Sequence, residues 1–270
     1  MVSSPSAPVQ RERILITVLT YPHPSESYDE LVCTAGITAR GEWVRLYPID
    51  YRYRPRDQQF RKFQWIEVDL EARGAGNDNR KESRRPKLDS IRVIAAPLSV
   101  DDDWRARRDI IDPLPHSTVG ELEASYERDR TSLGIVRPSR IDDLVVEPAD
   151  RAWKGSWQDV QNQLRLFDAQ PKKLEKLPFK WSYIFTCPDR AEPYKRMIED
   201  WEIGALFLNL RETHGEERAA QMVREHYLSR VAAPTRDVRF FMGTRFPYNT
   251  WVIVGVFWPP IKRQLDLGLS

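Results

Sequence analysis

The clearest structural pattern in the sequence is the alternation in Glu42-Trp43-Val44-Arg45-Leu46-Tyr47-Pro48-Ile49. A second stretch, Gln64-Trp65-Ile66-Glu67-Val68-Asp69-Leu70, has the same kind of alternation. Both stretches alternate with period two, so every second side chain lies on the same face of a predicted strand. One face of each strand is aliphatic. The opposite face carries Trp43, Arg45 and Tyr47 in the first stretch and Trp65, Glu67 and Asp69 in the second. We therefore predict two strands with one apolar face and one aromatic and charged face.

Strand-like segments surround these two stretches. The run 13–20 is rich in β-branched residues, and the run 30–37 forms a hairpin with Trp43–Pro48 through a short connection. A further strand is predicted at 90–95. Residues 13–97 are therefore expected to form a mostly antiparallel curled sheet or small barrel, preceded by a flexible tail at residues 1–12.

The rest of the chain combines helices and strands. Residues 98–178 are predicted to be a helical, acidic connector, with a capping box at Thr118 and Glu121 and helical apolar spacing at 157–167. Residues 179–262 are predicted to form a C-terminal unit of strand, helix, helix, strand and strand. Its segments are 179–187, a helix at 190–211 capped by Asp189 and Glu192, a helix at 215–231, and strands at 237–242 and 250–257. The fold class is α+β, and the two β-rich parts are compatible with one packed body.

The composition indicates a globular protein and excludes several classes. Of the 270 residues, 41% are hydrophobic and 30% are charged, which is typical of a soluble domain. Two cysteines, Cys33 and Cys187, are too few for a disulfide framework. The N-terminus lacks the apolar region of a signal peptide, and no apolar run approaches the roughly 20 residues of a membrane span. We expect a cytoplasmic protein with reduced thiols and no membrane contact.

Charge is unevenly distributed along the chain. Residues 40–92 contain 14 Lys and Arg against 9 Asp and Glu, whereas residues 101–150 contain 7 against 13. This asymmetry is typical of a polarised surface or of two faces that neutralise each other.

The aromatic and basic strand face is the leading functional candidate. Single-stranded nucleic acid is held by rings that stack on bases, at roughly 1–3 kcal/mol per base, beside cations that contact phosphates. A long polar loop at 73–87 adds further cations. We predict binding of DNA or RNA, with single strands preferred, through Trp43, Arg45, Tyr47, Arg52, Arg54, Arg80, Arg84 and Arg85. The structural alternative is that the rings pack under a neighbouring helix and Arg45 pairs with Glu67 across the sheet.

Carboxylates give a second, catalytic hypothesis. Glu67 and Asp69 lie roughly 6–7 Å apart on one strand face, and Asp78 or Glu82 could reach them from the polar loop. Such a group would bind Mg²⁺ and support a nuclease or phosphodiesterase. The lysine that usually accompanies these carboxylates is missing, and pairing with arginines is the alternative. No other cofactor is indicated, because the four histidines stand far apart and no zinc motif occurs.

Two further hypotheses remain open. The proline-stiffened loop after the first strand presents Tyr21, Ser25, Tyr28 and Glu30, a set suited to a recognition pocket. The charge asymmetry and the ring-rich C-terminal strands favour, as a third reading, a protein-interaction subunit of a larger complex.

Four phrases carry a resemblance to a known group of proteins. They are Thr20-Tyr21-Pro22-His23-Pro24-Ser25 leading to Glu30–Gly36, Trp43–Pro48, Asp200-Trp201-Glu202, and Gly255-Val256-Phe257-Trp258-Pro259-Pro260. Together they resemble a family of uncharacterised prokaryotic proteins associated with mobile or defence-type gene neighbourhoods. The resemblance implies nucleic-acid-related work, such as genome defence. Related sequences carry a Cys/His-rich insert after the strand at 179–187, where this chain has only Cys187, so the resemblance does not extend to a zinc site.

Overall fold

Six strands in the first part of the chain form one strongly curled sheet. The computed structural model describes residues 10–24, 30–72, 78–153, 174–245 and 249–261. The strand order is β7-β5-β4-β1-β6-β8, in which the strands are β1 (Gln10–Leu19), β4 (Thr34–Thr38), β5 (Trp43–Leu46), β6 (Gln64–Leu70), β7 (Ser83–Arg84) and β8 (Arg92–Val93). The predicted hairpin is confirmed, because β4 pairs antiparallel with β5. The sheet is open and not a closed barrel.

The two ends of this sheet approach each other beyond β7. Glu71 N donates to Arg85 O at 2.9 Å, and Lys87 N donates to Asp69 O at 2.8 Å. These bonds connect the segment after β7 to the end of β6. The end of the sheet formed by the start of β1, the β4–β5 turn and the end of β6 is its mouth. The first strand begins at Gln10, so the predicted tail is shorter than residues 1–12. A short ladder joins β2 (His23–Pro24) to β3 (Glu30–Leu31).

The two faces of the curled sheet are both covered over most of their area. Ile14, Val44, Ile66 and other aliphatic side chains fill the concave side. The convex side packs on a second sheet, so that Leu15, Ile37 and Trp43 share one core with Phe241 and Val254. The alternation read from the sequence is therefore correct, and the face opposite the aliphatic one is mostly an internal contact.

The middle of the chain contributes strands as well as helices. Its elements are α1 (Asp101–Ile111), β9 (His116–Ser117), α2 (Val119–Asp129), β10 (Leu133–Val136) and β11 (Arg140–Pro148). Because β9 and β10 join the sheet β15-β14-β10-β9 and β11 joins β11-β12-β13, this region is built into the fold and is not a separate helical connector. The predicted capping box is confirmed at the start of α2. The helix predicted at 157–167 lies outside the described residues.

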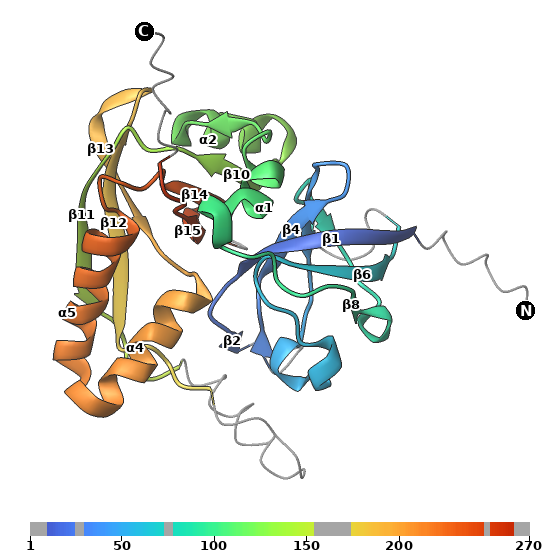
Figure 1. Ribbon diagram of the computed structural model, residues 1–270, viewed down its shortest axis with the longest axis horizontal. Helices are drawn as coiled ribbons and strands as arrows, with labels where there is room; N and C mark the ends of the chain where they lie inside the picture. Colours follow the sequence, from blue (N-terminus) through green and yellow to red (C-terminus); the bar gives the residue numbers. More distant parts are fainter. Residues whose placement is uncertain (1–9, 25–29, 73–77, 154–173, 246–248, 262–270) are drawn as a thin grey trace, which may run out of the picture.

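The C-terminal part carries two helices on a three-stranded sheet, as Figure 1 shows for α4 and α5 beside β11 and β12. Its elements are β12 (Phe179–Cys187), β13 (Arg190–Met197), α4 (Trp201–His214), α5 (Glu216–His226), a π-helical turn (Tyr227–Val231), β14 (Arg239–Thr244) and β15 (Trp251–Phe257). Trp181 and Tyr183 of β12 anchor the helices through hydrogen bonds to the carbonyl oxygens of Ala220 and Tyr227. The order is strand, strand, helix, helix, strand, strand.

The helix predicted to begin after Asp189 is a strand instead. The carboxylate of Asp189 does not cap residue 192: it accepts hydrogen bonds from Gly120 N and Tyr194 Oη, both at 2.8 Å. Only Tyr194 is fully buried within β13, as expected for an exposed edge strand. The actual N-cap is Asp200, whose Oδ1 accepts from Glu202 N at 3.2 Å.

A buried ion pair joins the two parts of the chain. Lys62 Nζ lies 2.7 Å from Asp200 Oδ2 and 3.0 Å from Glu202 Oε2. The same Asp200 oxygen accepts from Val256 N at 3.2 Å. Burial raises the pKa of Asp200 to about 6, although the Lys62 charge opposes that shift. The pair fixes the start of α4 against the curled sheet.

No helix in the described part of the chain combines the length and the apolar character that a membrane crossing requires.

Candidate ligand pocket at the mouth of the curled sheet

The predicted aromatic and basic face is largely buried. The Arg45 side chain is 0% exposed, and its guanidinium contacts Cys33 Sγ at 2.7 Å and Ser132 O at 3.1 Å. Trp43 packs edge-on against Phe241 with ring centroids 5.8 Å apart. The prediction that Arg45 contacts nucleic acid is therefore wrong, because a neighbouring sheet covers it. The structural alternative was correct that this face is covered, but the cover is strand β14 and not a helix, and Glu67 pairs with Arg13 and not with Arg45.

The other predicted cations have diverse environments. Arg80 is buried and pairs with Asp78 at 2.6 Å, so it does not extend from a solvated loop. Arg54 is mostly buried and pairs with Asp50 at 2.9 Å. Three further members of the predicted set, Tyr47, Arg52 and Arg84, are half-buried, whereas Arg85 is 43% exposed. The structure does not bring these residues together on one exposed face.

The four carboxylates of the catalytic hypothesis are also separated by their partners. Asp69 pairs with Arg11 at 2.8 Å, and Glu67 pairs with Arg13 at the same distance. Asp78 is occupied by Arg80, which helps to hold the pKa of Asp78 below its usual value against the opposing effect of burial.

The fourth carboxylate, Glu82, accepts hydrogen bonds from Ser132 N and Oγ. Within the part of the chain that the structure describes, no group of three or more His, Cys, Asp or Glu residues could hold a metal ion. The predicted Mg²⁺ set is therefore corrected to four separate structural contacts.

The loop predicted as a recognition pocket is only partly described. Tyr21 is buried and donates a hydrogen bond to Glu175 O at 2.8 Å, so its hydroxyl serves a structural contact. Glu30 begins the short strand β3. Ser25 and Tyr28 lie outside the described residues.

A pocket of about 340 Å³ lies instead at the mouth of the curled sheet. Its lining comes from the start of β1, from the β4–β5 hairpin and its turn, and from the segments at the end of β6 and around the start of β7. Its lining residues are Gln10, Glu12, Thr38, Arg40, Glu42, Trp43, Val44, Leu70, Glu71, Ala72, Glu82 and Arg84. Among the predicted residues only Trp43, Arg84 and, from the catalytic set, Glu82 line it.

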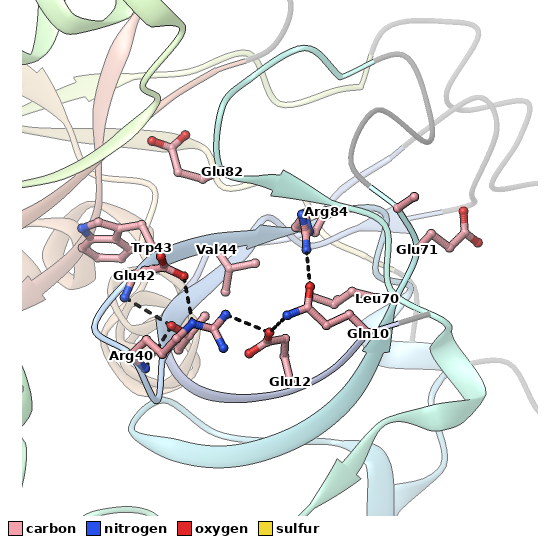
Figure 2. Close-up of a pocket in the computed structure, with 12 residues that line it drawn as sticks. Gln10, Glu12, Arg40, Glu42, Trp43, Val44, Leu70, Glu71, Glu82 and Arg84 are labelled. Atoms are coloured by element: carbon pink, nitrogen blue, oxygen red, sulfur yellow. Dashed lines mark hydrogen bonds and ion pairs between the residues drawn. The ribbon is translucent and has the colours of Figure 1, made fainter. Parts of the chain in front are cut away.

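A continuous chain of polar contacts crosses this pocket, as the dashed lines in Figure 2 show. Arg40 Nε donates to Glu42 at 3.4 Å, and Arg40 Nη2 donates to Glu12 Oε1 at 2.9 Å. Gln10 Nε2 also donates to Glu12 Oε1, while Gln10 Oε1 accepts from Arg84 Nη2 at 3.1 Å. The chain orients carboxylate, amide and guanidinium groups before any ligand arrives.

Glu12 is the central member of this chain. Its side chain is 6% exposed, and both hydrogen bonds from described residues go to Oε1. No described residue donates to Oε2. A carboxylate oxygen that no described residue contacts in this way can accept a hydrogen bond from a ligand N–H group.

The polar start of β1 is the sequence signal that indicates this site. Gln10 and Glu12 share a strand face with Ile14 and Ile16, which fill the concave core. Polar residues at the start of an otherwise apolar strand face indicate the place where that face leaves the core. Arg40 carried no comparable indication, because it belongs to the turn between β4 and β5.

Comparison with known families divides the chain near residue 114. Residues 115–269 match the family described as Domain of unknown function (DUF8757), and residues 10–113 match Domain of unknown function (DUF8758). The first match covers more than half of the 270 residues, so the chain belongs to the DUF8757 family. A comparison with curated proteins gave no match. The resemblance to an uncharacterised family is confirmed, and the association with defence-type gene neighbourhoods stays a prediction.

Proposed function

We propose that this member of the DUF8757 family binds nucleic acid by accepting one unstacked nucleobase into the pocket at the mouth of the curled sheet. The observation that carries the proposal is one pocket of about 340 Å³ that combines carboxylate, amide, guanidinium and indole groups. Its volume is at the lower end of the roughly 300–1,000 Å³ of small-molecule sites, which suits a single nucleoside. Proteins that recognise unpaired or extruded bases use such combinations of edge hydrogen bonds and ring contacts.

Cations at the rim supply contacts for the phosphates on either side of the held base. Arg40 lines the pocket and its side chain is 58% exposed. Arg85 is 43% exposed and lies 3.9 Å from Glu71, another lining residue. The Arg40–Glu42 and Arg85–Glu71 ion pairs are exposed and contribute little, so a phosphate can replace Glu42 or Glu71 as the partner without a large cost. Binding should therefore weaken as salt is added.

The proposal favours single strands over duplexes. A base in a duplex is stacked and paired, and its edge reaches a pocket only after a cost of a few kcal/mol for extrusion. An unpaired base enters without that cost. This preference was expected from the sequence on other grounds, and the pocket gives it a different physical basis.

The test is a fluorescence-anisotropy titration with single- and double-stranded DNA and RNA at two salt concentrations. The double variant Arg40→Ala with Arg84→Ala removes both guanidiniums that line the pocket. We expect it to weaken single-strand binding at least tenfold and to reduce the salt dependence. Each sample is also incubated with and without Mg²⁺ and analysed on a gel, which tests the catalytic hypothesis on the same material.

Arg13→Ala is the matched control. Arg13 lies on β1 close to the pocket residues, but it pairs with Glu67 and does not line the pocket. Combined with Arg11→Ala, which removes the partner of Asp69 on the same strand face, the Arg13→Ala substitution removes the same two charges outside the pocket and should leave the affinity unchanged. The proposal fails if the wild-type protein binds none of the four nucleic acids, or if the double variant and the control bind equally well. The first of these results would favour the protein-interaction hypothesis.

A further inference from the structure

We infer that Cys33 is a modification site, a thiol that a peroxide oxidises reversibly to a sulfenic acid, with Arg45 as its positioning residue. The inference goes beyond the proposed function, because Cys33 does not line the pocket at the mouth of the curled sheet. It rests on a half-exposed sulfur atom that is held against a fully buried guanidinium.

The backbone of Cys33 is fixed on both sides by one residue of the neighbouring strand end. Cys33 N donates to Thr20 Oγ1 at 3.0 Å, and Thr20 N donates to Cys33 O at 3.1 Å. The next residue, Thr34, begins β4. The side chain of Cys33 is half-exposed, so a reagent as small as hydrogen peroxide has access to the sulfur.

The guanidinium of Arg45 is a buried cation without a carboxylate partner. Its Nη2 donates to Ser132 O at 3.1 Å, and its Nη1 donates to Cys33 Sγ at 2.7 Å. Two nearby carboxylates, Glu82 and Asp78, have other hydrogen-bonding partners and form no ion pair with Arg45. Among the described residues, Arg45 Nε has no acceptor. A buried charge that lacks an anionic partner is costly, so this guanidinium favours any gain of negative charge or acceptor strength at the sulfur.

This environment suits both the attack by the sulfur and its oxidised product. Cysteine is nucleophilic as the thiolate, and reactive cysteines occur in partly exposed, electropositive environments. The buried Arg80 adds a second positive charge that interacts electrostatically with Cys33. Sulfur is only a weak hydrogen-bond acceptor. A sulfenic acid places an oxygen beside Arg45, and that oxygen is a better acceptor for a charged donor.

The proposed step balances with hydrogen peroxide as the oxidant. The sulfur of Cys33 attacks one peroxide oxygen, so that an S–O bond forms and the O–O bond breaks. The sulfur loses two electrons, and the other oxygen leaves as hydroxide, which takes up the thiol proton to give water. Two molecules of a small thiol reverse the change, because they become a disulfide while the oxygen leaves as water.

Cys187, the second cysteine of the chain, is an internal control. Its side chain is 3% exposed in the core of the C-terminal part, and burial raises the pKa of its thiol to about 11. Buried thiols in apolar surroundings are inert. Slow reaction of Cys187 also shows that the protein is folded, since unfolding would expose it.

The experiment treats the full chain with hydrogen peroxide in the presence of dimedone, which traps sulfenic acids, and locates the adduct by peptide mass spectrometry. In the native wild-type protein, Cys33 should react at least tenfold faster than Cys187. It should also react at least tenfold faster than Cys33 of the same protein unfolded in urea. Exposure alone would give the opposite order, because unfolding makes a half-buried thiol more accessible.

Variants and a reductant test the assignment and its reversibility. Cys33→Ser should remove the adduct, whereas Cys187→Ser should keep it. Dithiothreitol added after the peroxide and before dimedone should prevent the adduct and restore the free thiol.

The role of Arg45 is tested by two substitutions that differ in charge. Arg45→Gln removes the cation and should slow the oxidation of Cys33 at least tenfold, whereas Arg45→Lys keeps the cation and should restore most of the rate. A role in packing alone would affect both variants alike, and Cys187 reports whether each is folded. Arg13→Gln is the matched control, because it removes an exposed cation that pairs with Glu67, and it should leave the rate unchanged.

The wild-type measurements decide the inference even if the Arg45 variants do not fold. Equal rates for Cys33 in native and unfolded protein, or for Cys33 and Cys187 in native protein, would overturn it. An adduct that forms in spite of dithiothreitol would exclude reversible oxidation, and a wild-type rate in folded Arg45→Gln protein would exclude the role of Arg45. All of these results are independent of whether the protein binds nucleic acid.

Discussion

Arg45 is a fully buried cation at the contact between the curled sheet and the segment before β10. Its guanidinium is fully buried, with Cys33 Sγ at 2.7 Å and Ser132 O at 3.1 Å as partners. Burial lowers the pKa of Arg45, and the nearby Cys33, Glu82 and Asp78 oppose that change. Its long side chain also fills space between the sheets, so its role is packing as much as charge.

Arg45→Ala should therefore destabilise the protein by about 2–4 kcal/mol, through the cavity it leaves and the hydrogen bonds it removes. Urea denaturation followed by fluorescence measures the free energy of unfolding. Arg13→Ala serves as the reference, since the Arg13 side chain is 66% exposed. Equal stability of both variants would contradict the structural role of Arg45.

For individual residues, the sequence predicted which side chains share a strand face, but it did not predict which part of the chain packs against that face. Period-two alternation correctly placed Trp43 and Arg45 opposite the aliphatic Val44 and Leu46, whereas Tyr47 lies beyond the end of β5. The partner Phe241 comes about 200 residues later, and no local pattern connects it with Trp43. The sequence pattern places the pocket residue Glu12 in the tail, because the four polar residues at the start of β1 precede the apolar run by which the strand is recognised.

Among the elements, α2 follows its local sequence closely. Thr118 Oγ1 accepts from Glu121 N at 3.2 Å, and Glu121 Oε2 accepts from Thr118 N at 2.7 Å. This reciprocal pair satisfies two backbone amides that otherwise lack partners at the helix start.

Thr118→Ala should cost about 1 kcal/mol of stability, because a helix start loses the side-chain acceptor of its N-cap. Thermal and urea unfolding measure the loss. Thr118→Ser retains the hydroxyl and should restore most of the stability. If serine and alanine were equally destabilising, the hydrogen bond would not be the cause.

The capping-box rule that holds for α2 wrongly predicted a helix start at β13. Asp189 and Glu192 have capping-box spacing, but Asp189 is used by Gly120 and Tyr194. The strand β13 then forms the edge of the sheet beside β12. A tertiary contact to α2 and the pairing with β12 outweighed a local preference of about 1 kcal/mol.

For the whole molecule, the Lys62–Asp200 pair is the polar contact that couples the curled sheet to α4. Its Nζ–Oδ2 distance is 2.7 Å, and both side chains are almost fully buried. An acid whose pKa is higher in the folded than in the unfolded state contributes stability below its unfolded pKa of 3.8. That contribution is lost as the pH rises through about 6.

Lys62→Met should lower the free energy of unfolding by about 3–5 kcal/mol at neutral pH, because it leaves the Asp200 carboxylate buried without its cation. The deficit should grow as the pH is raised from about 5 to about 8, since protonated Asp200 tolerates burial better. Urea unfolding at several pH values measures this dependence. A deficit that is constant or shrinks with rising pH would contradict the assignment. A double variant with Asp200→Asn should remove the pH dependence.

The shared core between the curled sheet and β14–β15 has a consequence for how such chains can change in evolution. The two family matches adjoin at residue 114, and Leu114 itself is buried in that core. Exchange of one half between two relatives by recombination would join core surfaces that had not adapted to each other. Viable chimeras should therefore need compensating substitutions at paired positions such as Trp43 and Phe241, and lineages should inherit the two halves together.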